Sequence, residues 1–174
     1  EEYCQFYTAD IATGQLTPLA DYEASIGYST VGSDARLGGG PGCKLEGDKF
    51  WFLSTVGDQG NLVCMDRQGN LSTAFGKGGS VDSFDVQDGK VIFAGFQGQG
   101  LTELFDGEGN QLTHFNDAYL ADHEVCVPEY HTFTASDGFE IHGWAMKPHG
   151  CRKGKTYPAI LHIHGGPPTI FSDV

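Results

Sequence analysis

The sequence predicts a mainly β protein, and two observations support this prediction. Glycine supplies 26 of the 174 residues, and it separates short apolar runs without a collagen-like period. The chain also contains a repeat. Residues 66–75 match residues 106–115 at Asp, Gly, Asn, Thr and Phe, and residues 47–53 resemble residues 88–94. Repeats of about 40 residues that hold four short strands are typical of β-propeller blades.

The repeat also predicts where the strands lie. The clearest blade has strands at 81–86, 90–96, 101–105 and 111–115, and the preceding blade has strands at 42–45, 49–55, 62–65 and 71–75. Strands at 4–10 and 15–19 end an earlier blade, and a glycine-rich connection follows over 20–42. Residues 1–127 therefore form about two and a half four-stranded blades, whereas closed propellers use about four to eight. Because blades bury their faces against neighbouring blades, we expect a partial β-propeller here, incomplete as a domain.

The turns and the aromatic residues agree with this arrangement. Asp-Gly and Gly-Asn pairs supply the positive φ that tight hairpins require. The strand period places most aromatic side chains inside the blades. The predicted aromatic core consists of Phe50, Trp51, Phe52, Phe75, Phe84, Phe93, Phe96, Phe105 and Phe115.

The charge is distributed unevenly along the chain. The formal net charge is −13; residues 1–130 contribute −14 and the remainder +1, which indicates a boundary near residue 130. An acidic surface disfavours nucleic acid and anionic membranes as partners. The five cysteines include no Cys-x-x-Cys pair, so we expect no metal or cofactor. No apolar run approaches the 18 residues of a membrane span, and we expect a cytoplasmic location.

The pattern changes in residues 128–174, which we assign to a second, incomplete domain. Two strands are expected at 130–135 and 140–146, around a Ser-Asp-Gly turn. Residues 159–163 form a nearly continuous apolar run, which is typical of a strand buried on both faces of an α/β sheet. That run leads into a His-Gly-Gly-Pro segment at 164–167.

Residues 133–148 and 157–167 resemble the start of the catalytic domain in the prolyl oligopeptidase family. The similarity is greatest to its acylaminoacyl-peptidase and dipeptidyl-peptidase-like branch. Members of this family place a β-propeller before an α/β-hydrolase domain. The resemblance implies that 1–127 are the last propeller blades and that 128–174 are the first strands of the hydrolase domain. It also implies a serine-type peptidase that cleaves short peptides through an acyl-enzyme.

By the same resemblance, the His-Gly-Gly-Pro segment is an oxyanion loop. Backbone N–H groups around Gly165 or Gly166 would stabilise the charge that develops on the substrate carbonyl oxygen. His164 stands where related dipeptidyl peptidases have a tyrosine whose hydroxyl group assists. The chain contains no Gly-x-Ser-x-Gly sequence, which this type of hydrolase uses for its nucleophile. We therefore predict that the chain alone is catalytically inactive, because it lacks the Ser-Asp-His triad.

Two other interpretations remain open at this point. His162 and His164 could begin the metal site of an amidohydrolase, although two histidines are too few to specify a metal. The blades could instead belong to an interaction module without catalysis, because propellers host many functions. Asp82, Asp85 and Asp88 are better explained as a solvated strand edge and turn than as a calcium site. Uncovered blade edges lead us to expect a homo-oligomer.

Overall fold

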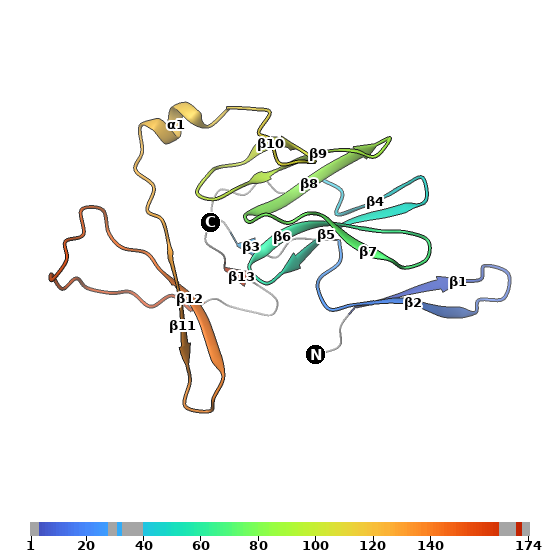
Figure 1. The fold of residues 1–174 in the computed structure, drawn as a ribbon, viewed down its shortest axis with the longest axis horizontal. Helices are drawn as coiled ribbons and strands as arrows, with labels where there is room; N and C mark the ends of the chain where they lie inside the picture. Colours follow the sequence, from blue (N-terminus) through green and yellow to red (C-terminus); the bar gives the residue numbers. More distant parts are fainter. Residues whose placement is uncertain (1–3, 28–30, 33–39, 164–169, 172–174) are drawn as a thin grey trace.

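The structure is a computed structural model that describes residues 4–27, 31–32, 40–163 and 170–171. Nearly all of its regular structure is β-strand, which confirms the mainly β prediction (Figure 1). The strands are β1 Cys4–Ala9, β2 Leu16–Tyr22, β3 Val31–Gly32, β4 Cys43–Glu46, β5 Lys49–Val56, β6 Gln59–Met65, β7 Leu71–Phe75, β8 Ser80–Gln87, β9 Lys90–Phe96, β10 Glu103–Asp106, β11 Glu129–Thr134, β12 Glu140–Ala145 and β13 Ile170–Phe171. The helix α1 spans Asp117–Ala121. Within the described residues, no helix has the length and apolar character needed to span a membrane.

The main sheet consists of two consecutive antiparallel meanders. The first is β4–β5–β6–β7, the four-stranded plan of a propeller blade, and the second is β8–β9–β10. A single parallel pairing between Gly60 and Ser80 joins β6 to β8. Strands β7 and β9 have the bounds that the repeat predicts, and the other strands of the meanders begin within three residues of their predicted starts.

Three two-stranded pairings accompany the main sheet. The hairpin β1–β2 lies before the first meander, and the hairpin β11–β12 follows α1. Strand β13 pairs with β3 in parallel. The predicted partial blade at 4–19 and the predicted strand pair at 130–146 are therefore present as hairpins.

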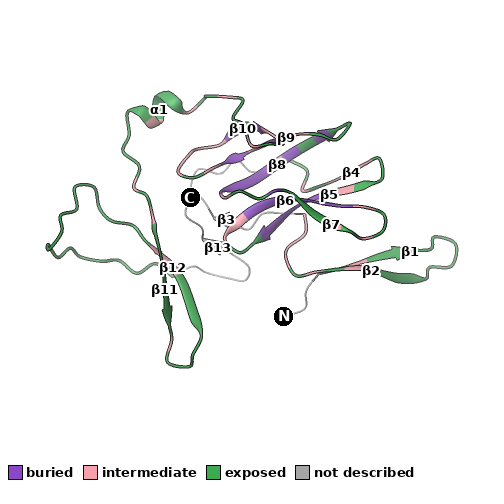
Figure 2. Ribbon diagram, in the orientation of Figure 1, coloured by how far each residue is buried: buried purple, intermediate pink, exposed green. Residues whose placement is uncertain are grey.

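Both faces of β5 and β6 are buried, because successive side chains along each strand point to opposite sides and both sides are covered (Figure 2). Trp51 and Leu53 belong to a cluster that includes Phe84 and Phe93 of the second meander. Phe52, between them in sequence, belongs to a separate cluster that packs against β1 and β2. The core therefore consists of two layers, one on each side of β5 and β6.

An aromatic stack forms the centre of the layer between the meanders. The ring of Phe93 lies 4.5 Å from that of Phe75 and 5.2 Å from that of Phe105, centroid to centroid. All three side chains are at most 5% exposed. Seven of the nine predicted core aromatics are buried, and Phe50 is partly buried against the second layer.

The turns that begin at Asp66 and Asp106 have the same hydrogen bonds. Oδ1 of Asp66 accepts hydrogen bonds from the backbone N–H groups two and four residues later, both at 2.9 Å. Asp106 makes the same pair of bonds at the same distances. Hydrogen bonds from the side chains of Asn70 and Asn110 contribute most to lowering the pKa of Asp66 and Asp106 respectively. The 40-residue repeat therefore preserves a turn that needs a carboxylate at its first position and an amide at its fifth.

The β8–β9 hairpin confirms the predicted use of positive φ. Asp88 has a φ of 51° and Gly89 a φ of 73°. Asp tolerates this left-handed region better than most residues do, and glycine adopts it freely. The Asp-Gly pair thus closes the hairpin with the twist that its strands require.

The predicted strand at 111–115 is wrong. Only Gln111 pairs with β10, through an isolated bridge to Phe105. The chain then leaves the ladder because Thr113 and Asn116 bond to the side chain of Glu103. Phe115 is consequently 78% exposed and is not part of the core.

The predicted strand at 159–163 is also absent. These residues have no strand structure and are exposed; Ile160 is 95% and Leu161 84% accessible. A strand buried on both faces requires flanking strands that satisfy its backbone and cover its side chains. No described strand pairs with this segment, so its apolar sequence alone does not produce a strand here.

We expect Phe93→Ala to destabilise the chain by about 3–5 kcal/mol, because it leaves a cavity between Phe75 and Phe105. Urea unfolding followed by tryptophan fluorescence would measure the change. Phe115→Ala is the matched control; since its ring is exposed, the expected change is within about 0.5 kcal/mol. Equal losses in the two variants would contradict the two-layer core.

Candidate functional site

The predicted oxyanion residues His164, Gly165 and Gly166 lie outside the described residues. Their assignment therefore remains a prediction. His162 lies in the exposed segment that precedes them. Among the described residues, no group of three or more His, Cys, Asp or Glu side chains could hold a metal ion.

The hairpin β11–β12 displays several polar pairs on a solvent-accessible surface. The Tyr130 hydroxyl contacts Nδ1 of His142, and the ring of Tyr130 lies edge-on to Trp144 at 5.7 Å. Lys147 forms an ion pair with Glu129. Exposed pairs of this kind contribute little free energy, so they do not by themselves indicate a functional site.

Among the described residues, the most buried charged side chain is that of Glu103 in β10. Strand alternation places Glu103 and Phe105 on the inner face, each 5% exposed, while Leu104 between them is 38% exposed. A buried carboxylate is costly unless hydrogen bonds replace its lost water.

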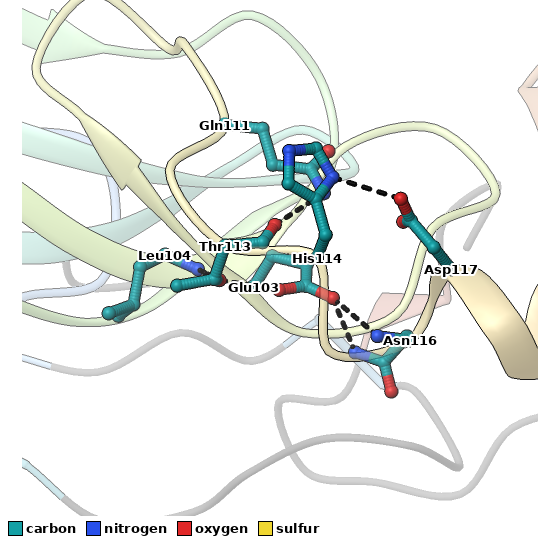
Figure 3. Close-up of polar contacts among 7 residues, drawn as sticks. All are labelled: Glu103, Leu104, Gln111, Thr113, His114, Asn116 and Asp117. Atoms are coloured by element: carbon teal, nitrogen blue, oxygen red, sulfur yellow. Dashed lines mark hydrogen bonds and ion pairs between the residues drawn. The ribbon is translucent and has the colours of Figure 1, made fainter.

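Residues from the segment after β10 supply those hydrogen bonds (Figure 3). The Thr113 hydroxyl donates to Oε2 of Glu103 and accepts a bond from the backbone N–H of Leu104 at 2.9 Å. The backbone N–H of Asn116 donates to Oε1 at 2.8 Å, and its Nδ2 donates to the same oxygen at 2.9 Å. Nδ2 also donates to the carbonyl oxygen of Thr102 at 2.8 Å. One carboxylate thus fixes the path of residues 113–116.

Burial and hydrogen bonding shift the pKa of Glu103 in opposite directions. Burial is the largest single influence on the pKa of Glu103 and acts to raise it. Hydrogen bonds from Thr113, Phe115 and Asn116 together outweigh it and hold the pKa below its ordinary value. Glu103 is therefore a buried negative charge at neutral pH.

A cavity of about 200 Å³ lies beside this network. Its lining combines two carboxylates, three side-chain amides, two glycines and three large apolar side chains. These residues are Gln97, Gly100, Leu101, Glu103, Phe105, Gly109, Gln111, Asn116, Asp117 and Leu120. The cavity therefore lies between the end of the second meander and α1.

His114 contacts Asp117 in this region. Its Nδ1 lies 3.0 Å from Oδ2 of Asp117 and 3.3 Å from Nε2 of Gln111. Since one ring nitrogen cannot donate and accept at once, the shorter contact to a carboxylate favours a proton on Nδ1. Gln111 then donates to the carbonyl oxygen of Thr113, at 2.7 Å.

Glu103 was not among the predicted site residues, although the sequence contains a signal for it. Residues 101–105 alternate, and Phe105 is a predicted core residue. A residue two positions away on the same strand must face the same side. Glu103 was therefore identifiable as an inward-facing charge, but its partners were not, because 111–115 resembled another strand.

Comparison with known proteins places the chain among peptidases. No family model matches it. The uncharacterized peptidase YuxL of Bacillus subtilis (strain 168) is 39% identical over 93% of this chain, which spans 26% of that protein. Dipeptidyl peptidase 8 of Homo sapiens is 45% identical over 40 residues, or 23% of this chain and 4% of its own length. This chain is related to peptidases of the prolyl oligopeptidase family.

A solved structure supports the fold. An acylaminoacyl peptidase in complex with Z-Gly-Gly-Phe-chloromethyl ketone superposes with a TM-score of 0.65 at 20% identity. The superposition covers 83% of this chain and 21% of that protein. The sequence relatives confirm the resemblance seen in 133–148 and 157–167, and the chain spans 26% of the length of the YuxL peptidase.

Replacing Glu103 by Gln should make stability less dependent on pH. The folded-state pKa of Glu103 lies below its unfolded value, so its ionised form stabilises the fold above about pH 4.5. This contribution disappears as the pH falls through the lowered pKa. We expect the free energy of unfolding to fall less steeply between about pH 5 and 3 in Glu103→Gln than in the wild type.

Urea titrations at several pH values would measure these slopes. Glu108→Gln is the control, since Glu108 lies in the turn directly after β10 and is exposed, and its slope should match the wild type. A wild-type slope in Glu103→Gln would show that the buried carboxylate does not contribute to acid sensitivity.

Proposed function

We propose that this chain is part of a serine-type peptidase that acts on short peptides through an acyl-enzyme. The observation that supports this most directly is the 39% identity to the YuxL peptidase over 93% of the chain. Because the chain spans 26% of that relative, the proposed activity is that of a longer protein. The compound bound to the acylaminoacyl peptidase, a blocked tripeptide chloromethyl ketone, supports short peptides as the substrate class.

In this proposal, residues 1–127 are the last blades of a propeller and residues 128–174 open an α/β-hydrolase domain. The change in structure after α1 supports the division, since β11–β12 shares no strand pairing with the main sheet. Phe133 and Ile141 are direct cross-strand partners and are 60% and 40% exposed. Such an apolar pair suits a hairpin that packs against further strands of a hydrolase sheet.

The proposed chemical role of this chain is confined to the oxyanion loop. Backbone N–H groups at Gly165 or Gly166 would stabilise the tetrahedral intermediate, with His164 beside them. Preorganised donors of this kind contribute about 3–4 kcal/mol each to lowering the barrier. Without a nucleophile, however, no acyl-enzyme forms, so the chain alone is proposed to be inactive.

The cysteines support the proposed cytoplasmic location, and exposed apolar residues support the proposed homo-oligomer. Cys43, Cys64, Cys126 and Cys151 are free thiols, which suits a reducing, cytoplasmic compartment. Ile92 and Leu104 expose apolar surface on the second meander, at 50% and 38%. This surface supports self-association of the isolated chain.

The complete protein that contains this chain should hydrolyse N-acetyl-alanine p-nitroanilide or benzyloxycarbonyl-Gly-Gly-Phe p-nitroanilide. Diisopropyl fluorophosphate should abolish the reaction, because it modifies the active-site serine. The 174-residue chain, assayed beside it at equal concentration, should release no p-nitroaniline.

A chelator provides the control for the metal-dependent alternative. Activity that survives EDTA excludes an amidohydrolase site built on His162 and His164. Loss of activity with EDTA, together with insensitivity to the serine reagent, would overturn the proposed function. If the 174-residue chain turned over substrate and the serine reagent abolished this activity, the proposal that the chain alone is inactive would be wrong.

A further inference from the structure

The cavity beside Glu103 has a lining chemistry that the proposed peptidase function does not use. Its volume of about 200 Å³ is below the roughly 300–1,000 Å³ typical of drug-sized ligands. It suits a small molecule or a single side chain.

The charges that line the cavity have one sign. Glu103 is a buried carboxylate held in its ionised form, and Asp117 adds a second carboxylate. No Lys, Arg or His is part of the lining among the described residues; the neighbouring His114 pairs with Asp117 at 3.0 Å. A cation in the cavity would offset part of the cost of burying Glu103.

The three amides of the lining are arranged as acceptors. Nε2 of Gln97 donates to the carbonyl oxygen of Gly109 at 3.3 Å. Nε2 of Gln111 and Nδ2 of Asn116 donate to backbone carbonyl oxygens at 2.7 and 2.8 Å. These acceptors fix which end of each amide is nitrogen. These bonds use the nitrogen end of each amide, and the oxygen at its other end can accept a hydrogen bond.

Apolar side chains complete the lining. Leu101, Phe105 and Leu120 contribute to the same cavity. A ligand that matches this lining has N–H donors and a positive charge at one end and a short aliphatic body at the other. A bare metal ion fits less well, because the described residues contain no cluster of three ligating side chains.

We propose that this cavity binds a small organic cation, a primary ammonium or guanidinium group on a short aliphatic stem. The same chemistry is available from a free amine and from a Lys or Arg side chain of another polypeptide segment. The proposal is independent of peptidase activity, since it concerns binding at a different part of the chain.

Butylguanidinium and its neutral isostere butylurea are the probes that test the proposal. We expect butylguanidinium to shift the side-chain amide signals of Gln97, Gln111 and Asn116 in ¹⁵N-correlated NMR spectra of the 174-residue chain. The dissociation constant should be on the order of 1 mM, as befits so few contact atoms. Butylurea should leave these signals unchanged. Equal shifts with both probes, or none with either at about 20 mM, which is roughly twentyfold above that constant, would overturn the proposal.

Asp117→Asn tests the contribution of charge without disturbing the hydrogen bonds of Glu103. Binding of butylguanidinium should weaken by up to about fivefold, as expected for a partly exposed ion pair. Asp137→Asn removes an equal charge from the β11–β12 turn and should leave binding unchanged. If Asp137→Asn weakens binding as much as Asp117→Asn does, general electrostatic attraction explains the binding and the cavity is not the site.

A titration of the complete protein identifies the natural source of the cation. Binding that persists there assigns the cavity to a free small molecule. If the complete protein does not bind butylguanidinium while the 174-residue chain does, the cavity is assigned to a Lys or Arg side chain of the same protein. Both outcomes support a cation site, and absence of binding in the 174-residue chain refutes it.

Discussion

The structure depends on one constraint: a blade of this size must bury both of its faces, and only neighbouring strands can cover them. β5 shows the constraint directly, because Trp51 and Leu53 belong to one layer and Phe52 to the other. The first layer needs the second meander, and the other needs β1–β2. Packing of Phe75, Phe93 and Phe105 across the first layer therefore determines how the two meanders lie against each other.

Polar links between the meanders are weaker than this packing. Lys44 reaches Asp85 and the carbonyl oxygen of Val86, and Glu46 accepts a bond from the N–H of Asp88. The Asp85 side chain is 74% exposed, so its ion pair contributes about 0–1 kcal/mol. One fully buried Phe contributes about 1.5–3 kcal/mol. Hydrophobic packing holds the blades together, and the polar links set their register.

This balance explains which parts of the fold were predictable from sequence. Strands β7 and β9 and the Asp88-Gly89 turn follow from local period and turn chemistry, which the repeat shows twice. The error at 111–115 arose because Thr113 and Phe115 match residues of β7 in the repeat, while a long-range partner, Glu103, redirects the chain. At 159–163 the apolar run lacks neighbouring strands. The candidate oxyanion loop was predictable only by resemblance, since its chemistry resides in backbone N–H groups that no side-chain pattern specifies.

Glu103 is the long-range contact that ends the local strand pattern of the second repeat, because it fixes the path of the chain after β10. In the first meander, β7 pairs with β6 from Leu71 to Phe75, whereas the equivalent segment of the second meander pairs only at Gln111. The buried charge of Glu103 requires donors, and Thr113 and Asn116 can supply them only by leaving the ladder. The direction in which the chain proceeds to α1 and β11 is thus fixed by hydrogen bonds to one carboxylate. Asn116, which donates to Glu103, is also the N-cap residue of α1, so the same carboxylate fixes where the helix begins.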